Sequence, residues 1–346
     1  MEQEIKKDLQ DWAKIISRYK KPDNTKAAIQ ILNSFLPFIG LWILMYYSLS
    51  VSYFITLALA FINAFFLVRI FIIQHDCGHQ SFLGKRKWNN RIGLICSFFS
   101  AIPYKYWAKV HNHHHGHTGQ LEQRNFGDIN FLTVDEFRKL PFYRKFIYRI
   151  FRSPFMLFCI VPIIYLGISL RYPFMGKNLK GWKSIHKALN INNFLFVLFF
   201  AGCGFLLGWK NFLMVHLPIV YFFGVIAFWF FYIQHQHEDT YQQWKNNWDY
   251  LIAAIKGATY YKLPKVFQWL TGNIGFHHIH HLSAKIPNYN LEQCARENPI
   301  LQKHVKILTF TESLKTIHNK LWDEESKRMI TFSEYEKLQK RKTEAA

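Results

Sequence analysis

The stretch VSYFITLALAFINAFFLVRIFIIQHDCGH, from Val51 to His79, decides the fold of this chain. Its first part, Val51–Ile73, is apolar over a length that exceeds the roughly 20 residues needed to cross the hydrocarbon core of a membrane. His75 and His79 follow directly, at a spacing that places both side chains on one face of a helix. The stretch therefore predicts a membrane-spanning helix that carries a pair of histidines at its end.

Three further runs are long and apolar enough to span a membrane, and they cover residues 31–49, 191–207 and 212–233. Together with the run at 51–73 they predict an all-α integral membrane protein with four transmembrane helices in two hairpins. Two shorter apolar runs, at 92–103 and 154–170, are expected to be re-entrant or to lie along the membrane. A cytosolic helical region that carries the histidines is expected to cap the bundle.

The chain of 346 residues is strongly basic, with 43 Lys and Arg against 22 Asp and Glu and a net charge of +21. The basic residues flank the apolar runs, which favours anionic membrane lipid as their partner and argues against nucleic acid. Since Lys and Arg collect on the cytoplasmic side of short loops, the pattern places both termini in the cytoplasm of a multi-pass cell-membrane protein. The five scattered cysteines and the lack of a cleavage site after the first apolar run argue against a secreted disulfide scaffold.

The chain is predicted to comprise three parts. Residues 1–28 form an amphipathic cytosolic segment, in which apolar side chains from Ile5 to Tyr19 recur at helical spacing, as in a helix lying on a membrane surface. Residues 29–298 form the membrane domain, with its histidines on the cytosolic side. Residues 299–346 form a charged cytosolic tail that is mostly helical.

Thirteen of the 17 histidines fall into four short clusters, each at or just beyond a predicted membrane boundary. Two clusters contain the pattern H-x-x-H-H, whose members share one helix face. With the pair at the end of the run 51–73, they give eight converging imidazoles: His75, His79, His111, His114, His115, His277, His280 and His281. Eight is too many for one metal and suits two, and imidazole binds iron, copper and zinc alike. His235, at the end of the last span, is predicted to be a ninth ligand.

The remaining histidines are predicted to have other roles. Those that interleave with the ligand pattern are expected to support the ligands or to lie at the surface, and they are His113, His117, His237 and His278. His216, near the outer end of the last span, is expected to be structural. The histidines expected to be solvated are His186, His304 and His318.

The histidine clusters and their surroundings resemble those of the integral-membrane fatty acid desaturases. The segment Gly272–Leu291 is the most similar part, and Arg69–Phe82 and Trp107–His115 resemble the other two histidine boxes of the family. The resemblance is strongest with the Bacillus-type acyl-lipid desaturases, whose Q-H-x-x-E-D pattern recurs at Gln234–Asp239.

The resemblance implies an oxygen-dependent oxidoreductase that holds two irons with the nine histidines and uses O2 as co-substrate. In the Bacillus-type group, a cis double bond is set at the delta-5 position of a saturated chain esterified in membrane phospholipid. Ferredoxin or flavodoxin supplies the electrons, and we expect it to be a separate protein here. Related stearoyl-CoA enzymes use an asparagine, through water, one helical turn before the ninth histidine, and the residue here is Phe231.

Metal-bound histidines usually donate their second ring N–H to a carboxylate or a carbonyl. The residues predicted to support the histidines in this or a similar way are Asp128, Glu238, Asn273 and Trp107. A solvated position is the alternative for both carboxylates. Lys105 and Lys109 lie close to the second histidine cluster in the sequence, and they are expected to hold a lipid phosphate, to dock an acidic ferredoxin or only to face the solvent.

Three other classes of protein stay open. A hydroxylase of the same membrane di-iron superfamily would share the histidines, although the extension Ile286–Tyr289 after the third box favours a desaturase. A histidine-rich metal transporter would place polar ligands within its spans, which here are nearly free of ionisable side chains. A haem-binding membrane cytochrome would need only one or two axial histidines, and eight converging histidines argue against it.

Overall fold

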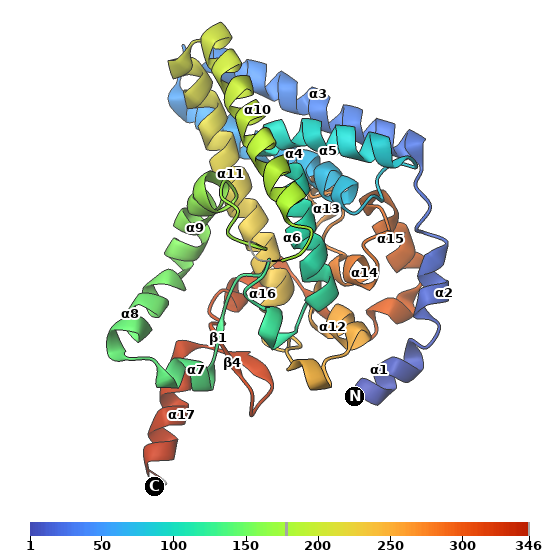
Figure 1. Cartoon of the computed structure of the whole chain (residues 1–346), viewed down its shortest axis with the longest axis vertical. Helices are drawn as coiled ribbons and strands as arrows, with labels where there is room; N and C mark the ends of the chain where they lie inside the picture. Colours follow the sequence, from blue (N-terminus) through green and yellow to red (C-terminus); the bar gives the residue numbers. More distant parts are fainter. Residues whose placement is uncertain (177–178, 345–346) are drawn as a thin grey trace.

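The computed structural model describes residues 1–176 and 179–344, so the last two residues of the predicted tail lie outside it (Figure 1). Within these ranges the chain is mainly helical and carries five short strands. Four helices are long and apolar enough to cross a membrane. They are α3 (Asn24–Ser48), α4 (Tyr53–Gly78), α10 (Lys183–Leu207) and α11 (Trp209–His235). The four predicted spans are therefore confirmed as helices of this kind.

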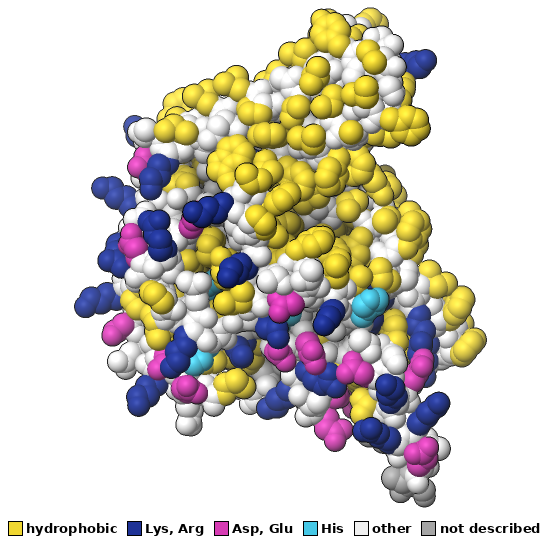
Figure 2. Space-filling model, turned by 180° about the vertical axis from the view of Figure 1, so that it is seen from behind, with side chains coloured by type: hydrophobic (Ala, Val, Ile, Leu, Met, Phe, Trp, Pro, Cys, Tyr) yellow, Lys and Arg dark blue, Asp and Glu magenta, His cyan; other side chains and the backbone are white. Residues whose placement is uncertain are grey.

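Long helices that follow each other in the chain pack side by side. α3 packs against α4 and α10 against α11, while α4 and α11 also contact each other. Asp23 caps α3, because its carboxylate accepts hydrogen bonds from the backbone N–H groups of Thr25 and Lys26 at 2.9 and 3.1 Å. Gly208 separates α10 from α11 with a φ of +81°, which glycine adopts readily. Hydrophobic side chains cover the upper part of the molecule in Figure 2, and charged side chains gather in its lower part.

The two shorter apolar runs form different structures. The first belongs to α5 (Arg86–Ser100), which packs along α4. The second forms α9 (Val161–Ile164) between two π-helical turns, and it follows α8 (Phe142–Phe151) after a bend of 59°. That neither run crosses the membrane stays a prediction.

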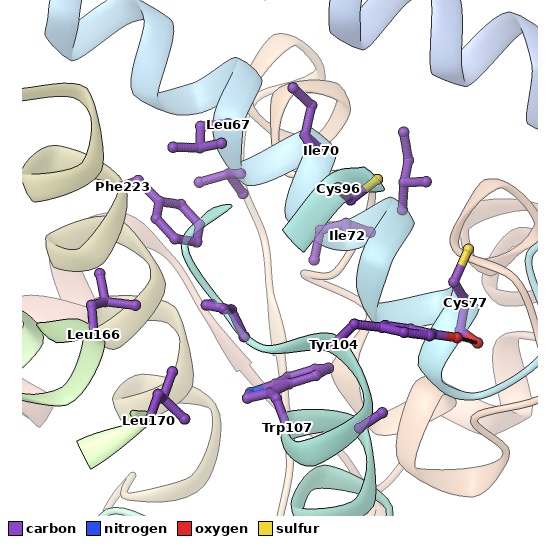
Figure 3. Packing of buried hydrophobic residues seen from close by; sticks show 14 of the residues in the cluster. Leu67, Ile70, Ile72, Cys77, Cys96, Tyr104, Trp107, Leu166, Leu170 and Phe223 are labelled. Atoms are coloured by element: carbon purple, nitrogen blue, oxygen red, sulfur yellow. Dashed lines mark hydrogen bonds between the residues drawn. The ribbon is translucent and has the colours of Figure 1, made fainter. Parts of the chain in front are cut away.

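One buried cluster joins the long helices to α6 (Tyr104–His117), which carries the second group of histidines. Leu67 and Ile70 of α4 are fully buried in this cluster. Figure 3 shows Phe223 of α11 and Trp107 of α6 in the same region of packing. Because burial of each large apolar side chain contributes about 2 kcal/mol, this packing holds the end of α4 firmly beside α6.

Short helices follow α11 and bring the third histidine cluster back to the long helices. They are α12 (Tyr250–Lys256), α13 (Lys265–Leu270), α14 (His277–Leu282) and α15 (Asn288–Glu297). α14 packs against α12 and α15, and α13 packs against α4. Asp249 caps α12 by accepting a hydrogen bond from the backbone N–H of Ile252 at 3.0 Å.

The N-terminal helices α1 (Glu2–Asp8) and α2 (Trp12–Ser17) bury their apolar face inside the protein. Ile5 and Ile16 are fully buried in a cluster with Ile255 of α12 and Leu291 of α15. The expectation that this face lies on the membrane surface is therefore wrong. An amphipathic pattern shows that a helix covers an apolar partner, and here that partner is the protein itself.

The C-terminal segment contains strands as well as the helices α16 (Phe310–Thr316) and α17 (Phe332–Glu344). Its β3 (Lys306–Leu308) runs parallel to β2 (Thr259–Tyr261), with Thr259 opposite Lys306. A second sheet has the order β1-β4-β5, and it consists of β1 (Leu132–Thr133), β4 (Leu321–Asp323) and β5 (Arg328–Ile330). β1 leads into α7 (Val134–Lys139), which Thr133 and Glu136 begin as a capping box. The segment is thus paired with earlier parts of the chain, and it contains strands that were not expected.

Candidate metal centre

The predicted ligand histidines lie on four helices whose ends meet. His75 lies in the last turn of α4 and His79 directly follows that helix, whereas His235 is the last residue of α11. The two H-x-x-H-H triplets lie in the last turns of α6 and along α14. All nine side chains are buried, with exposed fractions between 0% and 8%.

A tight turn before α14 brings the third cluster to the end of α4. Gly272 and Asn273 both adopt left-handed backbone conformations, with φ of 57° and 58°. A Cβ atom on Gly272 would lie only 2.8 Å from a methyl carbon of Ile72 in α4. A glycine is therefore needed at this position so that the connection between α13 and α14 can lie directly on α4.

The nine histidines form two adjacent groups. In the first group, one ring nitrogen from each of five residues lies within 4.8 Å of the others, and the members are His75, His79, His111, His115 and His280. His114, His235 and His281 form the second group by the same measure. His277 joins the second group, because its Nε2 lies 2.9 Å from Nε2 of His235 and 3.1 Å from Nε2 of His281. The structure thus brings all nine predicted histidines together, as five and four.

Hydrogen bonds at Nδ1 fix the orientation of several of these rings. Nδ1 of His75 lies 2.9 Å from the Asp76 carboxylate, and Nδ1 of His79 lies 2.8 Å from Oδ1 of Asn112. Nδ1 of His235 donates to the backbone oxygen of Gly257 at 2.9 Å. A nitrogen that faces an oxygen acceptor carries the proton, so the lone pair of each of these rings is on Nε2. These Nε2 atoms are the ones directed toward the two groups.

Burial favours the uncharged form of six of these histidines. It lowers the pKa values of six of them well below the ordinary value, and the neighbouring imidazoles lower them further: His79, His111, His115, His277, His280 and His281. Neutral imidazole is the form that binds a metal. Nε2 of His79 has no hydrogen-bond partner among the described residues, as expected for an atom that serves as a ligand.

Two of the predicted supporting residues contact the histidines. Oδ1 of Asp128 lies 3.0 Å from Nδ1 of His114. Burial raises the pKa of Asp128, but the interactions with His114 and the neighbouring histidines together outweigh this effect and lower the pKa below its usual value. The Trp107 ring stacks on His111, with 4.4 Å between the ring centroids and an interplanar angle of 17°.

The other two supporting residues do not have the expected contacts. Glu238 is wrong as a supporting residue, since its carboxylate is 56% exposed and pairs with Arg328 at 3.0 Å. The backbone oxygen of Glu238 accepts a hydrogen bond from Met329 in β5, which turns the segment away from the histidines. For Asn273, the described contacts are those of the backbone turn before α14.

Sequence reasoning missed several residues that orient the ligands. Besides Asp76, they are Asn112, Gly257 and Asn288. Asp76 and Asn112 each directly follow a ligand histidine in the sequence, and Asn288 lies in the extension after the third box. Their positions next to the ligands were the available signal, whereas Gly257 contributes only a backbone oxygen and leaves no such signal.

The non-ligand histidines lie outside both groups. His113 and His117 stack on each other, and His216 stacks on Phe212 inside α11, which fits its predicted structural role. His237 and His278 are fully buried, with no hydrogen-bond partner for either ring among the described residues. His318 is exposed as predicted.

Two histidines that were expected to be solvated have partners. His304 lies 2.7 Å from the Asp8 carboxylate, with a side chain only 12% exposed. His186 lies 3.0 Å from the backbone oxygen of Met175. The prediction of solvated side chains is therefore wrong for both, because the N-terminal helices and the segment before α10 fold over them.

Phe231 borders the group of four histidines. Its ring centroid lies 5.3 Å from that of His114 and 5.3 Å from that of His235. This position, where related enzymes carry a water-binding asparagine, is therefore apolar here. Phe231 therefore offers no donor atom to the four-histidine group.

The donor set fits two transition-metal ions. Nine buried imidazoles divide into sets of five and four, and several pairs of their Nε2 atoms lie about 3 Å apart, close enough to bind a common cation. Imidazole ligands suit iron, and carboxylate or carbonyl partners at Nδ1 strengthen such ligands. An apolar helical bundle that ends in such a site is the arrangement of a membrane protein with a histidine-rich metal centre.

Comparison with known proteins identifies the family. The sequence pattern of the family described as Fatty acid desaturase matches residues 49–311, and the chain belongs to this family of oxidoreductases. A Fatty acid desaturase of Bacillus subtilis is 41% identical over 96% of this chain and 93% of its own length. An sn-1 oleoyl-lipid 12-desaturase of Picosynechococcus is 25% identical over 70% of this chain and 68% of its own. An sn-2 acyl-lipid omega-3 desaturase (ferredoxin), chloroplastic, of Helianthus annuus is 26% identical over 68% of this chain and 54% of its own.

Proposed function

We propose that this protein is an oxygen-dependent acyl-lipid desaturase that introduces a cis double bond into the acyl chain of a membrane phospholipid. Two irons would be held by the nine histidines, five around one and four around the other. The observation that carries the proposal is the convergence of nine buried imidazoles at the ends of apolar helices. The relatives that act on acyl lipids support the substrate class.

The reaction balances with an external electron donor. Two hydrogens leave adjacent methylenes of the acyl chain, and one O2 is reduced to two waters. Of the four electrons that O2 needs, two come from the broken C–H bonds and two from the donor, and two protons are taken up. The name of the Helianthus relative supports ferredoxin as the donor, and flavodoxin would supply the same electrons.

The protein residues position and protect the reacting groups. Bound iron supplies the oxygen activation that unactivated C–H bonds require. The uncharged histidines leave the charge of the metals uncompensated, which keeps such a centre electrophilic. Asp76, Asn112 and Gly257 hold the rings in one orientation, and the packing of Trp107 on His111 excludes water from one side of the first group.

We infer four crossings in two hairpins, with both termini and the histidines on the cytoplasmic side of the cell membrane. α4 and α11 are each the second helix of a hairpin, and both end at the histidines. The two hairpins would therefore cross the membrane in the same direction and begin and end on the same side. α5 and the α9 region would lie at or dip into this membrane face, where the flanking basic residues would contact anionic lipid. The divisions at residues 28 and 298 stay a prediction, and α3 begins at Asn24, just before the first of them.

Expression in a host without desaturases tests the function. We expect a new double bond in the phospholipid acyl chains, located by mass spectrometry, and none in a His280→Ala variant. A His318→Ala variant, altered at an exposed histidine, should give the wild-type product level. An added hydroxyl group in place of the double bond would show that the enzyme is a hydroxylase, and full activity of His280→Ala would remove His280 from the centre.

A further inference from the structure

One face of α6 is exposed to solvent close to the first group of histidines. Lys105, Lys109, Asn112 and Gly116 are all exposed, and their spacing places them on one side of the helix. A Cβ atom on Gly116 would meet no atom within 4 Å. Among the described residues, no other element covers this part of α6, which leaves room for a partner to approach.

Asn112 connects this face to the histidines. Its Oδ1 accepts a hydrogen bond from Nδ1 of His79 at 2.8 Å, while its amide nitrogen donates to the backbone oxygen of Ala108 at 2.7 Å. Lys285 approaches from α14's C-terminal side, and its ammonium donates to the backbone oxygen of His79 at 2.6 Å. His79, a member of the five-histidine group, is thus separated from the surface by a single side chain.

The face is positively charged and its charges are not neutralised by protein carboxylates. Lys105, Lys109 and Lys285 are exposed, and none of the ion pairs found among the described residues involves them. The positive electrostatic potential of these side chains attracts an acidic partner and increases its association rate.

In a second basic region of the protein, by contrast, basic side chains are paired with carboxylates. A cleft of about 580 Å³ lies between α1 and the β4–β5 hairpin and is lined by several lysines and arginines. Lys306 in this cleft pairs with Asp239 at 2.8 Å, and Lys303 pairs with Asp8 at 2.7 Å. Carboxylates in and beside the cleft cancel much of its charge, which favours the α6 face as the site for an acidic protein.

We propose that the α6 face docks an acidic electron-carrier protein, and that electrons enter the centre through Asn112 and His79. The inference rests on the proposed function, which needs two electrons from outside in each turnover. Each docking event oxidises the carrier by one electron and reduces the histidine-bound centre by one, so two reduced carriers serve one double bond. The hydrogen bond between Asn112 and His79 links this exposed face to a predicted metal ligand. This link favours an electron carrier over lipid as the partner of these lysines.

The first test measures binding without turnover, with an acidic [2Fe–2S] ferredoxin as the probe and the full-length protein in nanodiscs of neutral lipid. A Lys105→Glu/Lys109→Glu variant should bind ferredoxin about tenfold more weakly and with less dependence on salt. The matched control is Lys337→Glu/Lys340→Glu, the same charge change on exposed positions of α17, which should bind as the wild type does. Equal affinity of both variants would overturn the proposal.

A second variant tests the same surface without a change of charge. Gly116→Trp projects a large side chain from the open face, and it should weaken ferredoxin binding because the carrier can no longer approach α6. This variant still tests ferredoxin binding at α6 if the charge-reversed variant does not fold. Wild-type affinity of Gly116→Trp would place the carrier elsewhere and overturn the proposal.

Turnover separates this inference from the proposed function. With ferredoxin, Lys105→Glu/Lys109→Glu should show a KM for ferredoxin raised about tenfold, and with dithionite it should match the wild type. Wild-type protein that forms no double bond with dithionite would count against the proposed function, while the binding result would still stand by itself. If the variant instead loses binding to phosphatidylglycerol vesicles and keeps its ferredoxin affinity, the lysines serve lipid and the proposal is wrong.

Discussion

The carboxylate of Asp76 binds Asn288, a residue 212 positions later in the chain. One oxygen accepts hydrogen bonds from the backbone nitrogen and the side-chain nitrogen of Asn288, at 2.6 and 2.8 Å. The other oxygen lies 2.9 Å from Nδ1 of His75. A single buried side chain thus orients a predicted ligand and joins the end of α4 to the start of α15, just after the third histidine cluster.

An Asp76→Asn variant should lose bound iron and activity together. The amide that replaces the carboxylate has only one acceptor oxygen, so its NH2 group faces either the N–H of His75 or the donors of Asn288. Loss of such a partner of a metal-bound histidine typically costs 10- to 100-fold in metal affinity or activity. Iron per protein and double-bond formation measure this effect.

The control for Asp76 is a carboxylate away from the histidines. Asp239 is 54% exposed and pairs with Lys306, so an Asp239→Asn variant should keep the wild-type iron content. If Asp76→Asn also retained full iron and activity, the orientation of His75 would not depend on this carboxylate.

Trp107 should contribute to stability as well as to the site. Its ring stacks on His111 and lies 5.0 Å from the Phe71 ring of α4, and it is 8% exposed. Replacement of a buried tryptophan by alanine costs about 3–5 kcal/mol, so we expect Trp107→Ala to lower the free energy of unfolding by about that amount. Trp107→Phe, which keeps a ring, should lose much less, and thermal melts in detergent measure both. Similar melting temperatures for the two variants would show that the stacked ring is not needed.

Features set by local spacing could be predicted from the sequence. The four long helices follow from the length of the apolar runs, and the convergence of the histidines follows from their placement on one face at the helix ends. The division into five and four could not be predicted. It depends on how α6 and α14 are rotated against each other, and contacts between distant segments set this rotation.

Contacts between distant parts of the chain also explain the wrong predictions. Glu238 lies close to His235 in the sequence, but β5 binds its backbone and Arg328 binds its carboxylate. The apolar face of the N-terminal helices shows the correct pattern, yet no local signal tells whether a membrane or α12 covers it. His304 illustrates the same point, since its partner Asp8 lies 296 residues earlier in the sequence.

Arg152 should be essential for the fold around the second histidine group. It is fully buried and donates hydrogen bonds to the backbone oxygen of Asn130 at 3.1 Å and to Oε1 of Gln236 at 2.5 Å. Gln236 in turn donates to the backbone oxygen of Ile129, which stands beside Asp128. Arg152→Met leaves these buried acceptors without a donor, and we expect a loss of about 3 kcal/mol in the free energy of unfolding.

The neighbouring Arg149 provides the matched control for Arg152. It lies on α8, is 37% exposed and pairs with Glu336 at 2.9 Å. An exposed ion pair contributes at most about 1 kcal/mol, so Arg149→Met should unfold nearly as the wild type does in the same denaturation experiment. Equal losses for the two arginines would argue against a special role for the buried one.

Lys320 should make the stability of the protein depend on pH above neutrality. Its side chain is 3% exposed, its Nζ lies 3.4 Å from the hydroxyl of Tyr232, and Arg152 is a nearby positive charge. Burial, with a smaller contribution from Arg152, lowers the pKa of Lys320 to about 7. The pKa of an unfolded lysine is about 10.4, so between these values the unfolded chain holds a proton that the folded chain has released.

The free energy of unfolding should therefore gain a contribution from Lys320 as pH rises from about 7 to 9.5, with a slope of up to about 1.4 kcal/mol per pH unit. Below pH 7 the group is protonated in both states and its contribution is constant. Other groups titrate in this range as well, so the decisive quantity is the difference between the wild type and Lys320→Met. This difference should grow in favour of the wild type as pH rises, in denaturant titrations at a series of pH values. Parallel curves for the two proteins would show that Lys320 is charged in the folded state throughout.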